Sequence, residues 1–289
     1  MSSSTLPKQS GRTWLITGGT HGIGTEVARA AAAADARVLI TARNPELGEQ
    51  VRAEVGAARV IDLDLASMDS VRRAAAAVDE PIDVLINNAG TMPLSHQQTE
   101  DGFELTLGVN YLGPFALTNL LMDQVRERVV CVSSIAYKRG KIDWQDPHFR
   151  HGWWSSDVAY AQSKLAVMLW GFELQRRLNE SDRKVALVHP GWVVTNMQNA
   201  SRSRLLNQLN ARISGAIGQS AEDGARPVLV AATSDLPGAA YVTVSGRGGF
   251  RGRPMVADPG FRAQNPAASR RVWKFAAAET GTNLACRTS

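Results

Sequence analysis

A strand-like run that leads into a glycine-rich turn is the feature that most restricts how this chain can fold. Residues 12–17 (Arg-Thr-Trp-Leu-Ile-Thr) enter the turn Gly-Gly-Thr-His-Gly-Ile-Gly of residues 18–24, and an alanine-rich stretch follows from Glu26 to Ala34. Gly18 would permit a tight turn, Gly22 would let the backbone approach a pyrophosphate, and Gly24 would let the helix pack on the strand. With phosphates at the helix N-terminus, this order predicts a dinucleotide site that also involves Thr20, His21 and Ile23.

The second strand indicates which dinucleotide is bound. Residues 37–41 form an apolar run about twenty residues after the turn, where an acidic side chain would bind a ribose 2′-hydroxyl. The chain has Ala42, Arg43 and Asn44 at this point, and we expect Arg43 and Asn44 to contact the cofactor. Because a guanidinium can hold a 2′-phosphate by bidentate hydrogen bonds, Arg43 and His21 favour NADP(H) over NAD(H). The alternative is that Arg43 extends along the surface without a ligand.

Apolar runs alternate with helical segments along most of the chain. This alternation predicts an α/β fold with a doubly wound, mostly parallel, seven-stranded sheet and helices on both faces, as in Rossmann-like proteins. The strands are expected at residues 12–17, 37–41, 59–62, 84–87, 128–132, 184–189 and 240–243. The helices are expected at residues 22–34, 45–55, 67–78, 102–121, 157–179 and 221–232.

No linker divides the chain before its last forty or so residues, so we expect a single domain. Residues 1–245 would form the catalytic domain, with a flexible N-terminus at 1–11. Residues 246–289 would add an irregular extension and a helix packed on the same domain. The arm at 246–260, rich in Gly, Arg and Pro, would either cover a pocket or support a subunit contact.

Small and polar residues follow the predicted strands at the edge where ligands bind in such sheets. Asp64 and Leu65 are placed to reach an adenine, and Asn88-Ala89-Gly90 would let a cofactor lie close to the backbone. Ser133 and Ser134 follow the fifth strand. The turn after the sixth, which includes Pro190, Gly191, Val193 and Thr195, could wrap a nicotinamide. Each piece is a common turn or strand exit, but their order at successive strand ends is hard to attribute to chance.

Tyr160 and Lys164 lie four residues apart in a predicted helix, so both side chains lie on one face. A nearby ammonium favours phenolate, which would lower the pKa of the tyrosine from its ordinary value near ~10 and make it a general acid or base. The spacing alone is weak evidence, because it arises by chance in many helices. The dinucleotide features around it make a catalytic pair the better interpretation.

Charge and cysteine content exclude some classes of function. The net charge of +5 could suggest nucleic acid, but the basic residues are scattered and no nucleic-acid motif accompanies them. The two cysteines form no disulfide framework, which favours a reducing, cytoplasmic location. The N-terminal segment lacks the apolar core of a signal peptide, and no apolar stretch is long enough to span a membrane. We therefore expect a partner that is neither nucleic acid nor membrane, while a homo-oligomer stays open.

These motifs together resemble the short-chain dehydrogenase/reductase family from about residue 12 to residue 195. The resemblance rests on Thr-Gly-x-x-x-Gly-x-Gly, Asn-Asn-Ala-Gly, Ser, Tyr-x-x-x-Lys and Pro-Gly. Residues 108–115 (Gly-Val-Asn-Tyr-Leu-Gly-Pro-Phe), 132–136 (Val-Ser-Ser-Ile-Ala), 140–144 (Gly-Lys-Ile-Asp-Trp) and 159–166 look like the retinol dehydrogenase and WW-domain oxidoreductase branch. We expect no N-terminal membrane anchor of the kind that many retinol dehydrogenases carry.

The resemblance implies a catalytic tetrad of Asn110, Ser134, Tyr160 and Lys164. Tyr160 would donate a proton to a carbonyl oxygen that Ser134 holds. Lys164 would lower the pKa of the tyrosine and bind the nicotinamide ribose, and Asn110 would position a water that links Lys164 to solvent. The expected activity is an NADPH-dependent reduction of a bulky hydrophobic ketone, aldehyde or quinone, for instance in secondary metabolism. The alternatives are an alcohol dehydrogenase that runs the same site backward and a non-enzymatic NADP-binding regulator.

The substrate is the least determined part of this hypothesis. Trp153 and Trp154, in the insertion before Tyr160, could wall a pocket for a bulky carbonyl compound or could pack the insertion on the core. Residues 198–218 are also expected to border the pocket. His148 and His151 have a spacing compatible with a metal pair, but no third ligand accompanies them, so we expect no metal site.

Overall fold

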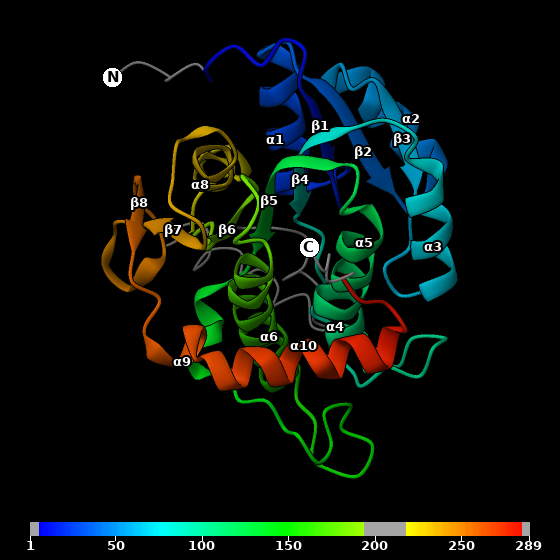
Figure 1. Cartoon of the computed structure of the whole chain (residues 1–289), viewed down its shortest axis with the longest axis vertical. Coiled ribbons are helices and arrows are strands. Elements are labelled where there is room, and N and C mark those ends of the chain that lie inside the picture. The colour runs from blue at the N-terminus through cyan, green and yellow to red at the C-terminus, as the bar shows by residue number, and fades with distance from the viewer. Residues whose placement is uncertain (1–5, 194–217, 285–289) are drawn as a thin grey trace, which may run out of the picture.

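The computed structural model describes residues 6–193 and 218–284, and it forms a twisted sheet covered by helices on both faces (Figure 1). The strand order is β3-β2-β1-β4-β5-β6-β7-β8, and all pairs are parallel except the last. The strands are β1 (Thr13–Ile16), β2 (Arg37–Ala42), β3 (Arg59–Asp62), β4 (Ile82–Asn87), β5 (Val125–Val132), β6 (Lys184–Val188), β7 (Ala240–Val244) and β8 (Pro254–Ala257). Of the sequence predictions, Thr195, residues 198–217 and Cys286 lie outside the described residues.

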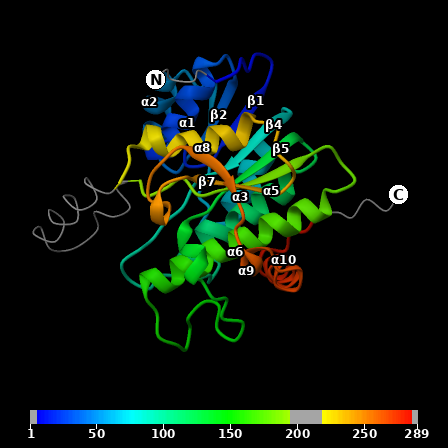
Figure 2. The ribbon, with the colours of Figure 1, turned by 90° about the vertical axis from the view of Figure 1, so that its left-hand side faces the viewer.

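The helices divide between the two faces of the sheet, as Figure 2 shows from the side. One apolar core lies under α1, α2 and α8, and the other lies under α3, α5, α6 and α10. The helical elements are α1 (Gly22–Ala33), α2 (Pro45–Val55), α3 (Met68–Ala77), α4 (Leu105–Leu107), η1 (Gly108–Leu112), α5 (Gly113–Leu121), η2 (Ile135–Arg139), α6 (Ser156–Arg177), α8 (Ala221–Thr233), η4 (Arg247–Gly249), α9 (Phe261–Gln264) and α10 (Pro266–Thr280).

The doubly wound parallel sheet is confirmed, but the predicted strand count was wrong. The structure has an eighth strand, β8, which pairs antiparallel with β7 inside the segment that the sequence predicted to be irregular. Pro254 opens this strand at the sheet edge, where a residue without an N–H is tolerated. The segment after Val244 thus continues the sheet before it reaches α9.

The sequence predicted one continuous helix over residues 102–121, but the structure divides this region into three helical elements. The structure starts this region at α4, where the Glu104 carboxylate accepts a hydrogen bond from the Leu107 N–H at 2.7 Å. A π-helical turn, η1, then precedes α5 and contains Asn110. Such turns occur frequently at functional sites, because they redirect a side chain from a packed helix.

The last described helix, α10, packs across α5 and α6 rather than extending away from the body (Figure 1). The Tyr111 hydroxyl donates a hydrogen bond to the Val272 carbonyl at 2.8 Å. Trp273 is buried and meets Phe115 edge to face, with ring centroids 4.9 Å apart. These contacts fix the outer wall of the core behind Asn110. Within the described residues, no helix has both the length and the apolar character needed to cross a lipid bilayer.

Candidate active site

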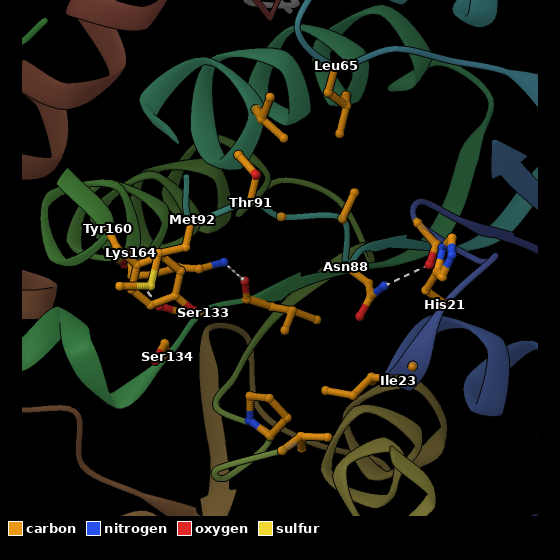
Figure 3. A pocket seen from close by; sticks show the side chains of 18 of the residues that line it. His21, Ile23, Leu65, Asn88, Thr91, Met92, Ser133, Ser134, Tyr160 and Lys164 are labelled. Carbon is orange, nitrogen blue, oxygen red and sulfur yellow. Dashed lines mark hydrogen bonds between the residues drawn. The ribbon is translucent and has the colours of Figure 1, made fainter. Parts of the chain in front are cut away.

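A cavity of about 710 Å³ opens at the carboxyl ends of the strands (Figure 3). It begins beside β1, where the strand order reverses between β2 and β4, and this is the position at which doubly wound sheets bind ligands. Figure 3 shows Ser134, Tyr160 and Lys164 at one end, and His21 and Ile23 near the start of α1 at the other. The predicted residues that line it are Gly18, Thr20, His21, Gly22, Ile23, Arg43, Asp64, Leu65, Asn88, Ala89, Gly90, Ser134, Tyr160, Lys164, Pro190, Gly191 and Val193.

The turn after β1 has the shape that a dinucleotide requires. Gly18 has φ +66°, and a Cβ there would lie 2.9 Å from the Ala89 Cα. A Cβ at Gly24 would lie 2.2 Å from the Gly18 carbonyl oxygen, so this glycine permits α1 to pack on the turn without lining the cavity itself. Both positions therefore require glycine, as the sequence predicted.

The N-terminus of α1 is free to bind an anion. The N-cap residue is His21, and its side chain makes no hydrogen bond to a backbone N–H of the helix. The Nδ1 atom of its ring instead shares a 3.0 Å hydrogen bond with the Thr20 hydroxyl. The longer helices α2, α3, α6, α8 and α10 all have a side-chain cap. The uncapped N–H groups and the helix dipole at the cavity fit the phosphates of a dinucleotide.

Thr17 was not singled out by the sequence, yet it holds the centre of this site together. Its hydroxyl accepts hydrogen bonds from the N–H groups of Asn88 at 3.0 Å and Ala89 at 3.1 Å. The Asn88 side chain donates back to the Thr17 carbonyl at 3.0 Å. These contacts join the glycine turn to the end of β4. The threonine before the first glycine was the available signal for this role.

Arg43 and Asn44, which follow β2, have different surroundings. Arg43 is exposed and lines the cavity, and its side chain has no hydrogen bond or ion pair with any described residue. Asn44 does not line the cavity. Its side chain caps α2 by accepting from the Leu47 N–H at 3.1 Å, so the structure gives it a local structural role, and its cofactor contact stays a prediction.

Burial dominates the environment of Tyr160. It raises the pKa of the phenol above its ordinary value, while the Ser134 hydroxyl and the positive charge of Arg139 oppose that rise. Ser134 caps η2 by accepting from the Ala136 N–H at 3.3 Å, so its hydroxyl is held at the same end of the cavity. The geometry allows both groups to meet one carbonyl oxygen.

Lys164 is buried beside Tyr160, as the sequence predicted from the four-residue spacing. Its ammonium lies 5.6 Å from the centre of the Tyr160 ring and donates to the Val132 carbonyl at 3.1 Å. Burial lowers the pKa of Lys164 itself to about 8, which places its proton exchange near neutral pH.

Asn110 lies behind the cavity instead of lining it. Its amide oxygen accepts from the Thr91 N–H at 2.7 Å, and its amide nitrogen donates to the Thr91 carbonyl and the Ser163 hydroxyl, both at 3.0 Å. A Cβ added to Gly90 would lie 3.2 Å from the Asn110 oxygen and 3.6 Å from the Lys164 nitrogen. The structure therefore brings Asn110 beside Lys164, where it fixes the loop that borders the ammonium.

The insertion before Tyr160 does not reach the cavity. Trp153 is 76% exposed, and Trp154 donates from its indole to Glu104 at 3.3 Å and packs against His96. The two tryptophans are therefore not walls of the described cavity, and Trp154 instead attaches the insertion to the core. The cavity is instead lined by apolar residues that the sequence had not assigned to a substrate pocket: Met92, Leu105, Val109, Ile135 and Trp192.

The two histidines of the insertion have structural surroundings. His148 is buried, accepts from the Glu104 N–H at 3.1 Å and meets Glu279 at 3.3 Å. His151 is exposed, and its backbone N–H donates to the Asp146 carboxylate at 2.8 Å. Among the described residues, no group of three or more possible metal ligands comes together.

His189, which begins the turn after β6, is a structural part of the site. Its Nδ1 accepts from the Ile135 N–H at 3.2 Å, so its Nε2 carries the proton and donates to the Gly249 carbonyl at 2.8 Å. His189 therefore joins the segment after Ser134 to the segment between β7 and β8. Burial lowers the pKa of His189 to about 4.

This low pKa predicts a loss of stability in mild acid. Between pH ~6.5 and 4 the unfolded chain binds a proton at His189 and the folded chain does not, so stability is full above that window and falls as the pH decreases. We expect His189 to account for about 2 kcal/mol of lost unfolding free energy by pH 5. Urea denaturation of wild type and His189→Asn across this range measures it, and parallel pH dependences would contradict it.

Comparison with known proteins agrees with the dinucleotide site that the geometry indicates. The family model described as short chain dehydrogenase matches residues 12–206. This chain belongs to the short-chain dehydrogenase family. The match covers the glycine turn, Ser134, Tyr160 and Lys164, and it ends beyond the turn after β6.

Curated relatives place the chain in the retinol dehydrogenase branch of that family. Human retinol dehydrogenase 13 is 39% identical over 206 residues, which cover 66% of this chain and 60% of that protein. Mouse polyprenol dehydrogenase is 36% identical over 288 residues, which cover 93% of this chain and 83% of that protein. The chain thus matches less than two thirds of the length of retinol dehydrogenase 13.

Solved structures share the fold of this chain. A crystal structure of an uncharacterized protein from Mycobacterium Paratuberculosis has 36% identity, a TM-score of 0.84 and 98% coverage of both chains. A short chain dehydrogenase from Burkholderia cenocepacia in complex with NADP has 27% identity and a TM-score of 0.63, with 79% of this chain and 93% of that chain covered. The family and the cavity together support a nicotinamide cofactor.

Proposed function

We propose that this short-chain dehydrogenase uses NADPH to reduce a bulky hydrophobic ketone, aldehyde or quinone, with Tyr160 as the general acid. The observation that carries the proposal is one cavity with Tyr160, Ser134 and Lys164 at its catalytic end and, among its lining residues, Arg43, which pairs with no other described side chain. The guanidinium suits a 2′-phosphate, and it stands directly after β2, where a carboxylate would bind a 2′-hydroxyl. The NADP complex of the Burkholderia relative is consistent with this preference.

The residues would share the reaction as follows. When bound, the nicotinamide cofactor supplies the hydride that the carbonyl carbon accepts. Ser134 would donate a hydrogen bond to the carbonyl oxygen and hold it beside Tyr160, which donates the proton as negative charge develops. Lys164, whose pKa of about 8 lies close to neutrality, would return a proton toward Tyr160. Its contact with the Val132 carbonyl keeps the ammonium in place between turnovers.

The apolar lining supports a hydrophobic substrate. Met92, Leu105, Val109, Ile135 and Trp192 line the cavity and offer apolar surface to a ligand. Oxidation of a hydrophobic alcohol is the second candidate, because the relatives are named for retinol and polyprenol as dehydrogenases. The same residues would catalyse this oxidation, with Tyr160 acting as the base. A cytoplasmic location and a homo-oligomer stay predictions from the sequence.

A two-directional substrate screen tests the proposal. Oxidation of NADPH would be followed with small aldehydes, steroid ketones, retinal and polycyclic quinones, and reduction of NADP⁺ with the matching alcohols, retinol and a polyprenol. We expect turnover of at least one large apolar carbonyl and a lower kcat/KM with NADH in place of NADPH. No turnover in either direction, or equal use of NADH, would overturn it.

A further inference from the structure

The connection between β7 and β8, residues 245–253, lies against the turn that follows β6, at the edge of the sheet (Figure 1). Two hydrogen bonds attach it there. The Trp192 N–H donates to the Phe250 carbonyl at 2.6 Å, and the His189 ring donates to the Gly249 carbonyl at 2.8 Å. Because Trp192 lines the cavity and β6 lies next to β5, this connection borders the same cavity that holds the proposed catalytic groups.

Glycine residues let this connection fold tightly around the Phe250 ring. Gly248 has φ +71°, a left-handed conformation that favours glycine, and a Cβ there would lie 2.6 Å from Cε2 of Phe250. A Cβ at Gly246 would collide with the Arg251 carbonyl oxygen, and the Gly246 carbonyl accepts from the Gly249 N–H at 3.0 Å. The sequence of the connection therefore leaves room for one large side chain, that of Phe250, beside the turn after β6.

Trp192 lines the cavity, and its backbone is held on both sides. Its N–H donates to Phe250, and its carbonyl accepts from the Gln219 N–H at 2.9 Å. Its side chain is less restricted, because the residue is 40% exposed, whereas Met92 and Leu105 on the same cavity are half-buried. An exposed side chain keeps its rotamer freedom unless a neighbour restricts it, so the orientation of the indole depends on a contact with another side chain.

Phe250 supplies that contact. The ring centroids of Trp192 and Phe250 lie 5.9 Å apart with an interplanar angle of 64°, which is an edge-to-face arrangement of the favourable kind. Phe250 is itself 38% exposed and does not line the cavity. It therefore acts on a bound ligand through the indole of Trp192, which offers a flat apolar face to that ligand.

We propose that Phe250 is a positioning residue that holds the Trp192 indole against the aromatic or polycyclic part of a bulky carbonyl substrate. This inference rests on the proposed function, and it narrows the substrate class to carbonyl compounds whose apolar ring system extends from the reacting group to Trp192. A small aldehyde held at Ser134 and Tyr160 would not reach the indole. The connection between β7 and β8 would then serve the pocket, which is one of the two roles that the sequence left open for it.

Binding of the naphthyl ketone prodan tests the inference without turnover, because protein loaded with NADP⁺ cannot reduce a ketone. The emission of prodan shifts to the blue in an apolar site, which gives its Kd by titration. We expect Phe250→Ala to raise this Kd about fivefold, which corresponds to about 1 kcal/mol and agrees with the strength of an aromatic pair. Phe250→Tyr keeps the ring and should stay within about twofold of wild type.

Phe261→Ala is the matched control. Phe261 is 72% exposed, begins α9 and does not line the cavity, so its removal should leave the Kd of prodan unchanged. The orientation of the indole is read by ¹⁹F NMR of protein labelled with 5-fluorotryptophan, with the Trp192 signal assigned by Trp192→Phe. This signal should shift in Phe250→Ala and stay in place in Phe261→Ala.

Kinetics should show the same selectivity. With the best large carbonyl compound of the screen, Phe250→Ala should raise KM about fivefold and change kcat less than about twofold, while KM for a small aldehyde stays unchanged. Absence of prodan binding to wild type, or an equal Kd in wild type and Phe250→Ala, would overturn the proposal. A change of oligomeric state in Phe250→Ala with an unchanged prodan Kd would do the same and would identify a subunit contact. The expected prodan and NMR results without any turnover would instead contradict the proposed function alone.

Discussion

Replacing Tyr160 with phenylalanine is expected to lower kcat by about a thousandfold or more while leaving the Kd for NADPH nearly unchanged. The substitution removes the hydroxyl that would donate the proton and keeps the ring that packs in the cavity wall. Loss of a positioned general acid reduces rates by about 10²–10⁴-fold. Steady-state kinetics with the best substrate of the screen gives kcat, and calorimetry with NADPH gives Kd.

Tyr137→Phe is the matched control for this experiment. Tyr137 lies on η2, donates its hydroxyl to the Pro259 carbonyl at 3.0 Å and does not line the cavity. Its loss should cost about 1 kcal/mol of unfolding free energy and change kcat less than about threefold. A near-normal rate in Tyr160→Phe would remove Tyr160 as the acid. A loss of NADPH binding would show that the hydroxyl acts on the cofactor.

Arg43→Ala is expected to weaken NADPH binding about 100-fold and NADH binding less than about twofold. The Arg43 guanidinium is exposed, lines the cavity and has no partner among the described residues, so it is free to hold a 2′-phosphate. A 100-fold change corresponds to about 2.7 kcal/mol, a plausible value for charge-assisted hydrogen bonds to one phosphate. Calorimetric titration of both nucleotides into wild type and variant measures the difference.

Arg59→Ala provides the control on the neighbouring strand. Arg59 opens β3, pairs with Asp79 at 3.1 Å and lies outside the cavity. Its removal should leave both nucleotide affinities within about twofold of wild type, since a phosphate in the cavity does not contact it. Equal losses for NADPH and NADH in Arg43→Ala would contradict the 2′-phosphate role, and so would an unchanged NADPH affinity.

Local patterns in the sequence were sufficient for most of the fold. The helix α2 has the bounds that the sequence predicted, because Asn44 supplies the cap, Pro45 starts the helix and Gly56 ends it with a left-handed conformation. The glycine turn was equally readable, because Gly18 and Gly24 meet requirements that no other residue satisfies there. These signals are encoded within a few neighbouring residues.

Features that depend on tertiary contacts could not be predicted from the sequence. The strand β8 has four residues, starts with Pro254 and gains its conformation by pairing with β7. Asn44 was expected to contact the cofactor because it follows Arg43, and the structure adds that its side chain caps α2. Trp192 and Phe250 are far apart in the chain, so the sequence gives no reason to pair them.

The central claim is that this cavity transfers hydride and proton between NADPH and an apolar carbonyl compound. The most direct measurement is deuterium transfer from NADPH deuterated at both C4 positions, followed by mass spectrometry of the products from the aldehydes and ketones of the panel. The account predicts an alcohol with one deuterium on the former carbonyl carbon, formed by wild type and not by Tyr160→Phe. Alcohol without deuterium, or no alcohol from any carbonyl despite tight NADPH binding, would contradict it.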